Sequence, residues 1–233
     1  EFIYPNYALT KSSYFEDNFF DNFEFISSGN QKKYETNIYE AVQINDLILN
    51  GKNQISKFGF NHNFKTMIKN VNSDGKNSTK FKEKSQSEIL SMFIYDIDIP
   101  LTKKEDKFDN LLIPKMSLRF SPNDSKNLKD ESRFLNPDNI FSLNRIGFNE
   151  TIEGGGSFTV GLDYEKKDKQ DNTVLSSKLA TVFRDELNEN LPTTSTLGKK
   201  QSDFVGEVNF NPVNNLLFEY KDEFFKRLIL SFQ

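Results

Sequence analysis

Apolar and polar residues alternate with a period of two along this chain, and this alternation limits the fold more than any other feature. Within 57–69, Phe58, Phe60, Phe64 and Ile68 stand at even positions, whereas Asn or Lys stands at the odd positions 57, 61, 63, 65 and 69. Within 157–164, the same holds for Phe158, Val160, Leu162 and Tyr164. Because successive side chains of a strand point to opposite faces, both segments predict two-faced β-strands.

The same alternation recurs more weakly along the chain. It is visible over 38–48, 93–99, 116–120, 175–183 and 204–210. Turn signals containing Gly, Pro, Asn and Asp stand at 28–30, 50–52, 73–75, 121–123, 136–138 and 211–212, and longer polar stretches cover 70–87, 121–138, 165–172 and 185–202. The chain of 233 residues therefore predicts about ten long strands joined by turns and polar loops.

Two architectures fit such a meander. In a soluble β-sandwich or small barrel, the apolar faces point inward. In an outer-membrane barrel, the apolar faces point outward to lipid, and Asn, Lys, Ser and Asp face a wet lumen. The pattern alone leaves both open, although long strands favour the membrane barrel. A transmembrane helix is excluded, because the chain has no run of about 18 apolar residues.

The composition excludes several classes of function. Lys and Arg number 30 against 34 Asp and Glu, so no strongly basic surface suggests a nucleic-acid partner. The chain has no Cys and a single His, which excludes disulfides, thiol catalysis and His-rich metal sites. The 24 Phe residues argue against a disordered polar chain.

Two motifs resemble ligand-binding loops without completing them. Segment 70–75 begins like an EF-hand loop, but Phe81 stands where the bidentate acidic ligand belongs, so we expect a polar hairpin loop. Gly154–Gly156 lack the Lys-Ser/Thr of a phosphate-binding loop. We expect these glycines to mark a bulge or a close approach of backbones.

Candidate acid–base residues are equally incomplete. His62 has polar neighbours and no nucleophile at a recognisable spacing, which predicts a solvated or rim histidine instead of a catalytic one. Asp96 and Asp98 share a strand face, and a lumen explains them as well as paired-carboxylate chemistry does. We therefore assign no catalytic, cofactor-binding or metal-binding residue, and we expect the chain not to be an enzyme.

Four segments carry a resemblance to a known family. Segment 139–155 reads Asn-Ile-Phe, then Arg145-Ile-Gly, then Glu153-Gly-Gly; the others are 112–122, 177–184 and 191–206, which ends Ser-Asp-Phe-Val-Gly. In this order they resemble the C-terminal barrel of the LPS-assembly protein LptD family, also called the organic solvent tolerance protein family. Two pairs depart from the family pattern: Ala180-Thr181 replaces Gly-Gln, and Asn149-Glu150 replaces Asp-Arg.

This resemblance, strongest over 85–212, implies an all-β fold for 1–233: a partial outer-membrane β-barrel domain, an open section of a large transmembrane barrel, without the family's periplasmic domain. It implies a part of the outer-membrane translocon that assembles lipopolysaccharide in the outer leaflet by non-enzymatic transport. The implied partners are lipopolysaccharide, an LptE-like plug lipoprotein, periplasmic LPS-transport bridge proteins and outer-membrane lipid, with no cofactor, and the implied location is the cell outer membrane.

Other expectations stay open at this stage. The chain could instead form a complete small outer-membrane channel or porin, or a soluble surface β-sandwich binding module. Segment 221–230 breaks the alternation and predicts a short helix or a damaged strand. As an open section with unpaired edges, the chain is expected not to be stable on its own.

Overall fold

The computed structural model describes residues 2–16, 19–213, 216–224 and 231–232. These residues form a single sheet of 13 strands. The strands are β1 Phe2–Tyr14, β2 Phe20–Lys33, β3 Tyr39–Gly51, β4 Gln54–Ile55, β5 Asn61–Lys76, β6 Gln86–Asp98, β7 Leu101–Lys104, β8 Phe108–Ser121, β9 Gly155–Asp168, β10 Thr173–Arg184, β11 Phe204–Val213, β12 Leu216–Phe224 and β13 Ser231–Phe232. None of the described residues forms a helix able to cross a membrane.

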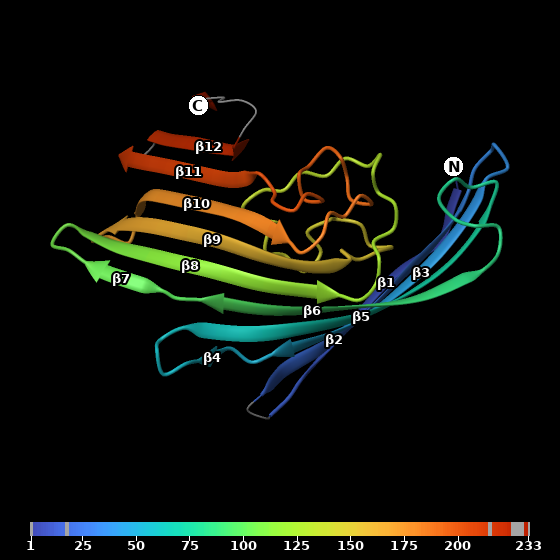
Figure 1. Cartoon of the computed structure of the whole chain (residues 1–233), viewed down its shortest axis with the longest axis horizontal. Coiled ribbons are helices and arrows are strands. Elements are labelled where there is room, and N and C mark those ends of the chain that lie inside the picture. The colour runs from blue at the N-terminus through green and yellow to red at the C-terminus, as the bar shows by residue number, and fades with distance from the viewer. Residues whose placement is uncertain (1, 17–18, 214–215, 225–230, 233) are drawn as a thin grey trace.

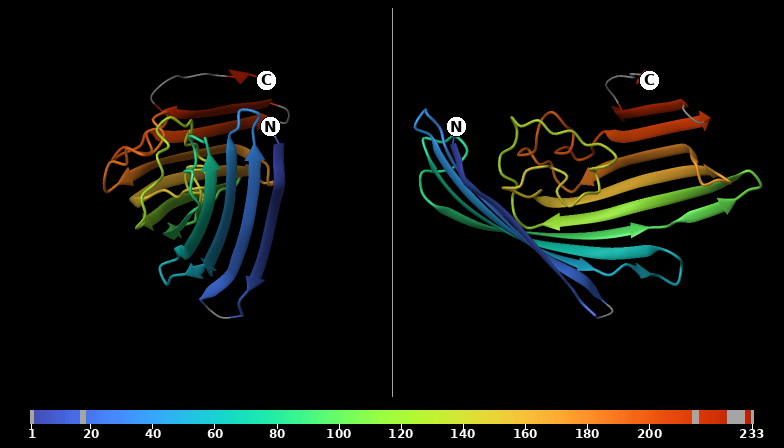
Figure 2. Two further views of the ribbon diagram at one scale, coloured as in Figure 1. Left: turned by 90° about the vertical axis from the view of Figure 1, so that its right-hand side faces the viewer. Right: turned by 180° about the vertical axis from the view of Figure 1, so that it is seen from behind.

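The sheet is an antiparallel meander, as the alternation predicts. Each long strand pairs with the next long strand along the chain, while β4 and β7 pair only with β5 and β8. The ten longest strands have 9 to 16 residues. Within the described residues the order begins at β1 and ends at β13, and these two strands do not pair. The sheet is therefore a curved, open section (Figures 1 and 2).

The convex face of the sheet carries the predicted apolar rows. Register places Phe93 beside Phe120, and Leu118 beside Phe158. Large apolar side chains between 38% and 56% exposed cover this face on β6, β8, β9, β10 and β11: Phe93, Met116, Leu118, Phe120, Leu162, Leu179, Phe183, Phe204, Val208 and Phe210. The alternation over 93–97, 116–120, 175–183 and 204–210 is thus confirmed, with its apolar side facing outward.

The concave face corrects the expectation of a polar lumen side. Toward the ends of the strands that carry the longest loops, this face is apolar and buried, and the alternating residues of 38–48 point into it. The cluster consists of Val42, Ile44, Ile48, Met67, Val71, Phe81, Leu90, Met92, Ile94 and Ile152. Its last member belongs to the loop 122–154, so a loop covers these positions and keeps water from them.

Three predicted turns are wrong, because the strands run through them. Gly29 lies inside β2, where a side chain would collide with the ring of Tyr7, 2.7 Å from an ideal Cβ. Gly75 lies inside β5 against the backbone of Phe81. Pro212 lies inside β11, beside a register shift between Phe210 and Val213. Glycine and proline here serve close approach and a bulge instead of a turn.

The polar segment 70–75 is also strand and not a hairpin loop. It pairs in register with 40–45 of β3, and Asn45 Nδ2 donates to Asn70 Oδ1 at 3.1 Å. Cross-strand amide pairs of this kind compensate for the low strand propensity of Asn. Beyond Lys221, β12 continues to Phe224, and residues 225–230 of the proposed helix or damaged strand lie outside the described residues.

The open edges generate a prediction for the isolated chain. Unpaired backbone groups at a strand edge cannot be satisfied in an apolar medium, so a segment of this kind has no closed state to adopt. Residues 1–233 refolded alone in detergent should not give a compact monomer that resists SDS until it is boiled. A heat-modifiable monomeric band on a gel would contradict the open-section architecture.

Candidate functional site

Two loops at the same end of the sheet fold together over its concave face. They are 122–154, between β8 and β9, and 185–203, between β10 and β11 (Figure 2). Backbone hydrogen bonds join them: Leu128 N donates to Asn190 O at 2.7 Å, and Thr193 N donates to Lys129 O at 3.3 Å. We call this pair of loops the plug.

An apolar cluster holds the plug against the strands. Val182 is fully buried on β10, and Val205 on β11 is 1% exposed. Around them pack six buried plug residues: Leu128, Leu135, Ile140, Ile146, Leu191 and Leu197. Burial of aliphatic side chains stabilises by about 1.5–3 kcal/mol each, so the plug is a packed part of the fold and not a loose surface loop.

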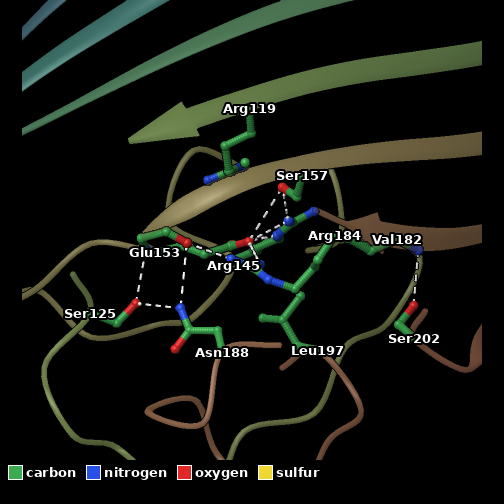
Figure 3. Close-up of polar contacts among 12 residues, drawn as sticks. Arg119, Ser125, Arg145, Glu153, Ser157, Val182, Arg184, Asn188, Leu197 and Ser202 are labelled. Atoms are coloured by element: carbon green, nitrogen blue, oxygen red, sulfur yellow. Dashed lines mark hydrogen bonds and ion pairs between the residues drawn. The ribbon is translucent and has the colours of Figure 1, made fainter. Parts of the chain in front are cut away.

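The carboxylate of Glu153 lies at the centre of the plug and is 2% exposed (Figure 3). Arg145 donates to it through two nitrogens, at 2.6 Å from Nε to Oε2 and at 2.5 Å from Nη2 to Oε1. Arg184, at the end of β10, donates to the same carboxylate from the other side and also to the carbonyl of Gly154. We call these three residues the arginine–glutamate cluster.

The remaining donors of Arg145 attach the plug to β9. Its Nη1 donates to Thr159 Oγ1 at 2.8 Å, and its Nη2 donates to Ser157 Oγ at 2.8 Å. The guanidinium of Arg145 therefore joins two segments of the loop 122–154 to each other, through Glu153, and to β9. Charge-assisted and bidentate bonds of this kind are the strongest hydrogen bonds in proteins.

A third buried arginine docks another part of the same loop. Arg119 on β8 is 4% exposed and donates to the carbonyls of Ser142 and Leu143 at 2.6 and 2.7 Å. Arg119 thereby supplies donors to two backbone carbonyls of the loop, and buried carbonyls need such partners. Three guanidinium groups thus converge on the plug, where Glu153 is the central carboxylate.

The three guanidinium groups determine the acidity of Glu153. Burial by itself would raise its pKa, but the positive charge and hydrogen bonds of Arg145, with the charges of Arg119 and Arg184, hold the pKa far below its usual range. A carboxylate of such low basicity is a poor general base for Ser157. The arginine–glutamate cluster is therefore suited to holding the plug in place and not to proton transfer.

The glycines after Glu153 confirm the predicted close approach. An ideal Cβ on Gly154 would collide with the carbonyl oxygen of Asn123, and Gly155 has a φ of 80°. Gly154 N also donates to Ser125 Oγ at 2.8 Å. Only glycine allows the chain to turn from the plug into β9 at this distance from a neighbouring backbone.

The other candidates from the sequence lie on β5 and β6, outside the arginine–glutamate cluster. His62 is the second residue of β5, and its Nδ1 lies 2.9 Å from the hydroxyl of Tyr95. Asp96 pairs with Lys65 at 3.3 Å, and Asp98 accepts from Asn61 Nδ2 at 2.8 Å. The two aspartates thus bind different neighbours, and they do not form a carboxylate pair.

Sequence reasoning assigned no role to the arginine–glutamate cluster. Arg145 and Glu153 both stand in the motif block 139–155, but an eight-residue separation within irregular structure has no periodicity that predicts a contact. Arg184 was visible only as the end of an alternating strand. Among the described residues, no group of three His, Cys, Asp or Glu side chains is placed to hold a metal ion.

The cluster predicts a large effect from removing one charge. Glu153→Gln leaves Arg145 and Arg184 buried without a carboxylate, which should cost about 3–5 kcal/mol. Protease cleavage of the plug in the membrane-embedded full-length protein should then accelerate by roughly a hundredfold or more. Glu150→Gln on the same loop is the matched control, because Glu150 pairs with the exposed Lys80 and such pairs contribute about 1 kcal/mol or less. Equal cleavage of the two variants would contradict the assignment.

Acid should release the plug in the same way. The folded-state pKa of Glu153 is lowered, so its stabilising effect is fully present above the ordinary value of 4.5 and is lost progressively as the pH falls below it. Cleavage of the plug by an acid protease should therefore increase below about pH 4.5 in the wild type. The Glu153→Gln variant should lack most of this pH dependence.

Comparison with known proteins agrees with the fold. The LptD family, described as LPS transport system D, matches residues 49–224. No curated protein matches the chain. The family match spans β5 to β12 and both loops of the plug, including the four segments that carry the resemblance. The family acts in lipopolysaccharide transport at the outer membrane, and this chain, matched over most of its length, belongs to the LptD family.

Proposed function

We propose that residues 1–233 are part of an outer-membrane β-barrel domain that delivers lipopolysaccharide to the outer leaflet without enzymatic chemistry. The observation that carries this proposal is the apolar convex face. Rows such as Leu118, Phe158 and Phe183 continue across three strands through direct register. An exposed apolar surface of this extent is typical of a surface that meets lipid or a partner.

The competing architectures explain this face less well. A soluble β-sandwich buries the apolar face of each strand between two sheets, whereas here the covered side is the concave one, with plug residues such as Ile140 packed against it. A complete small channel requires the terminal strands to pair, and β1 and β13 do not pair in the described part of the chain. An open section of a larger barrel agrees with both observations.

The lengths of the connections suggest the orientation. In bacterial outer-membrane barrels, long loops lie outside the cell and short turns face the periplasm. The loops 122–154 and 185–203 lie at one end, while 169–172 is a short turn at the other. We infer that the plug faces the cell exterior.

A plugged exterior end has a consequence for the route of the lipid. The plug covers the concave face at that end and is fixed by the buried arginine–glutamate cluster, so it obstructs an exit along the barrel axis. A lipid that enters from the periplasmic end is then favoured to leave sideways, between strand edges, directly into the outer leaflet.

The partners follow from the family scheme. An LptE-like lipoprotein would occupy the lumen, and periplasmic bridge proteins would supply the lipid. Toward the periplasmic end the concave face carries charged pairs, including Lys65 with Asp96 and Lys115 with Asp163. Such a polar surface suits contact with water or with the polar face of the LptE-like lipoprotein.

A single substitution on the convex face tests its contact with lipid. Leu118→Arg should destabilise the full-length protein in lipid vesicles by about 2–4 kcal/mol, the cost of a cation in the apolar band of a barrel. Phe58→Arg is the control, because Phe58 is 86% exposed in the turn before β5. Denaturant unfolding measures both; equal stabilities would count against lipid contact at Leu118.

The transport function is tested in cells. Depletion of the full-length protein should lower lipopolysaccharide staining on intact cells while the total in permeabilised cells is maintained. Unchanged surface staining after depletion would contradict the proposed function.

A further inference from the structure

The convex face changes from apolar to polar between two neighbouring rows in the middle of β2, β3 and β5. In one row, register aligns Phe25, Leu47 and Ile68. In the next row toward the plug end, it aligns Ser27, Asn45 and Asn70. On β2, β3 and β5 polar side chains therefore replace apolar ones between these rows, whereas Leu9 on β1 and Ile89 on β6 extend the exposed apolar surface into the polar row.

The polar row is internally hydrogen-bonded. Ser27 Oγ donates to Asn45 Oδ1 at 2.7 Å, and Asn45 Nδ2 donates to Asn70 Oδ1 at 3.1 Å. A ladder that satisfies its own polar groups can lie at the edge of an apolar medium at low cost. It places polar groups on the outer surface of β2, β3 and β5, next to the apolar row of Phe25, Leu47 and Ile68.

A groove opens in the outer surface directly beyond this ladder. Its volume is about 480 Å³, within the range of small-molecule sites. The lining residues on the convex face come from β1, β2, β3, β5 and the start of β6, and they include Tyr7, Gln31, Gln43, Asp74 and Ser87. Tyr7, Gly29, Gln43, Asn72 and Ser87 form one row through direct register.

The lining has the chemistry of a site for hydroxyl groups. The ring of Tyr7 lies over Gly29, where an ideal Cβ would be 2.7 Å from a ring carbon of Tyr7. Because Gly29 has no side chain, the ring can lie against the backbone and present an aromatic surface to the groove. The side chains of Gln31 and Gln43 are exposed, and their amides offer donors and acceptors. Asp74 adds a carboxylate, which already accepts from Ser85 Oγ at 3.2 Å.

The charge of the lining discriminates between headgroups. Among the described lining residues there is one carboxylate and no Lys or Arg. A phosphate would meet repulsion from Asp74 and no cation, whereas sugar hydroxyls can donate to the carboxylate and exchange hydrogen bonds with the amides. The apolar face of a sugar ring can pack against Tyr7.

We propose that this groove binds the saccharide headgroup of a glycolipid in the outer leaflet. The inference rests on the proposed function for the orientation of the plug end. It assigns to the outer wall of the barrel a sugar-binding site separate from the lumen, directly above the lipid-facing band.

A pair of photo-crosslinkers on one strand tests the site. A benzophenone amino acid is placed at Ser87, which lines the groove, or at Ile89, which is 70% exposed two residues along β6 on the same face and lies outside the lining. Cells that produce the full-length protein are irradiated, and adducts are identified with antibody to lipopolysaccharide and by mass. Each reporter is compared with and without Gln31→Ala, Gln43→Ala and Asp74→Ala.

We expect a lipopolysaccharide adduct at Ser87 that falls at least fivefold in the triple variant, while the adduct at Ile89 does not change. The groove proposal is overturned if the triple substitution leaves the Ser87 adduct unchanged, if it lowers both adducts equally, or if the adduct at Ser87 is with phospholipid. Heat-modifiability of the triple variant verifies that it folds.

A topology control separates this result from the proposed function. The chain has no Cys, so Glu131→Cys in the plug and Gln170→Cys in a short turn give unique labels within it. An impermeant maleimide should label Glu131→Cys on intact cells and Gln170→Cys only after permeabilisation. Correct labelling without a groove-dependent adduct refutes the groove alone, and reversed labelling refutes both the orientation and the groove.

Discussion

Register between neighbouring strands is the constraint on which the rest of this structure depends. A strand presents alternate residues on opposite faces, so a shift of one residue would move Leu118 and Phe120 from the convex face to the concave face. Antiparallel pairing from β1 to β3 and from β8 to β11, with register shifts near the strand ends, instead joins the apolar positions of separate segments into continuous rows. The low overall apolar fraction of 36% conceals this segregation, because it averages the two faces.

The concave face obeys a second constraint, which the plug satisfies. Its apolar side chains near the plug end require cover, and the loops 122–154 and 185–203 supply it. A loop buried in this way brings polar backbone with it, and Arg119, Arg145 and Arg184 provide donors for several of these groups. Glu153 compensates part of the resulting positive charge, so one carboxylate helps to hold the plug in place together with the apolar cluster around Val182 and Val205. This accounts for a rigid cover over the concave face at the plug end, and with the proposed orientation it agrees with an exit of the lipid between strand edges.

Much of the fold could be predicted from the sequence, since the alternation of Phe158, Val160 and Leu162 follows directly from strand geometry. The errors have a common cause. Gly29, Gly75 and Pro212 are turn formers in isolation, but in the sheet they accommodate an aromatic ring, a loop backbone and a bulge. The Arg145–Glu153 contact was not predictable, because it depends on how irregular segments pack. The apolar concave face was missed because the plug that covers it has no periodic pattern.

The central claim is that one face of the sheet meets lipid and the other does not. Spin labels at Met116→Cys and Lys115→Cys, adjacent on β8 and on opposite faces, test it most directly in the full-length protein reconstituted in vesicles. The label at Met116 should collide with oxygen dissolved in the lipid and be shielded from a water-soluble nickel chelate. The label at Lys115 should show much lower access to oxygen. Equal oxygen access at both positions, or nickel access at Met116, would contradict the two-sided sheet proposed for this protein.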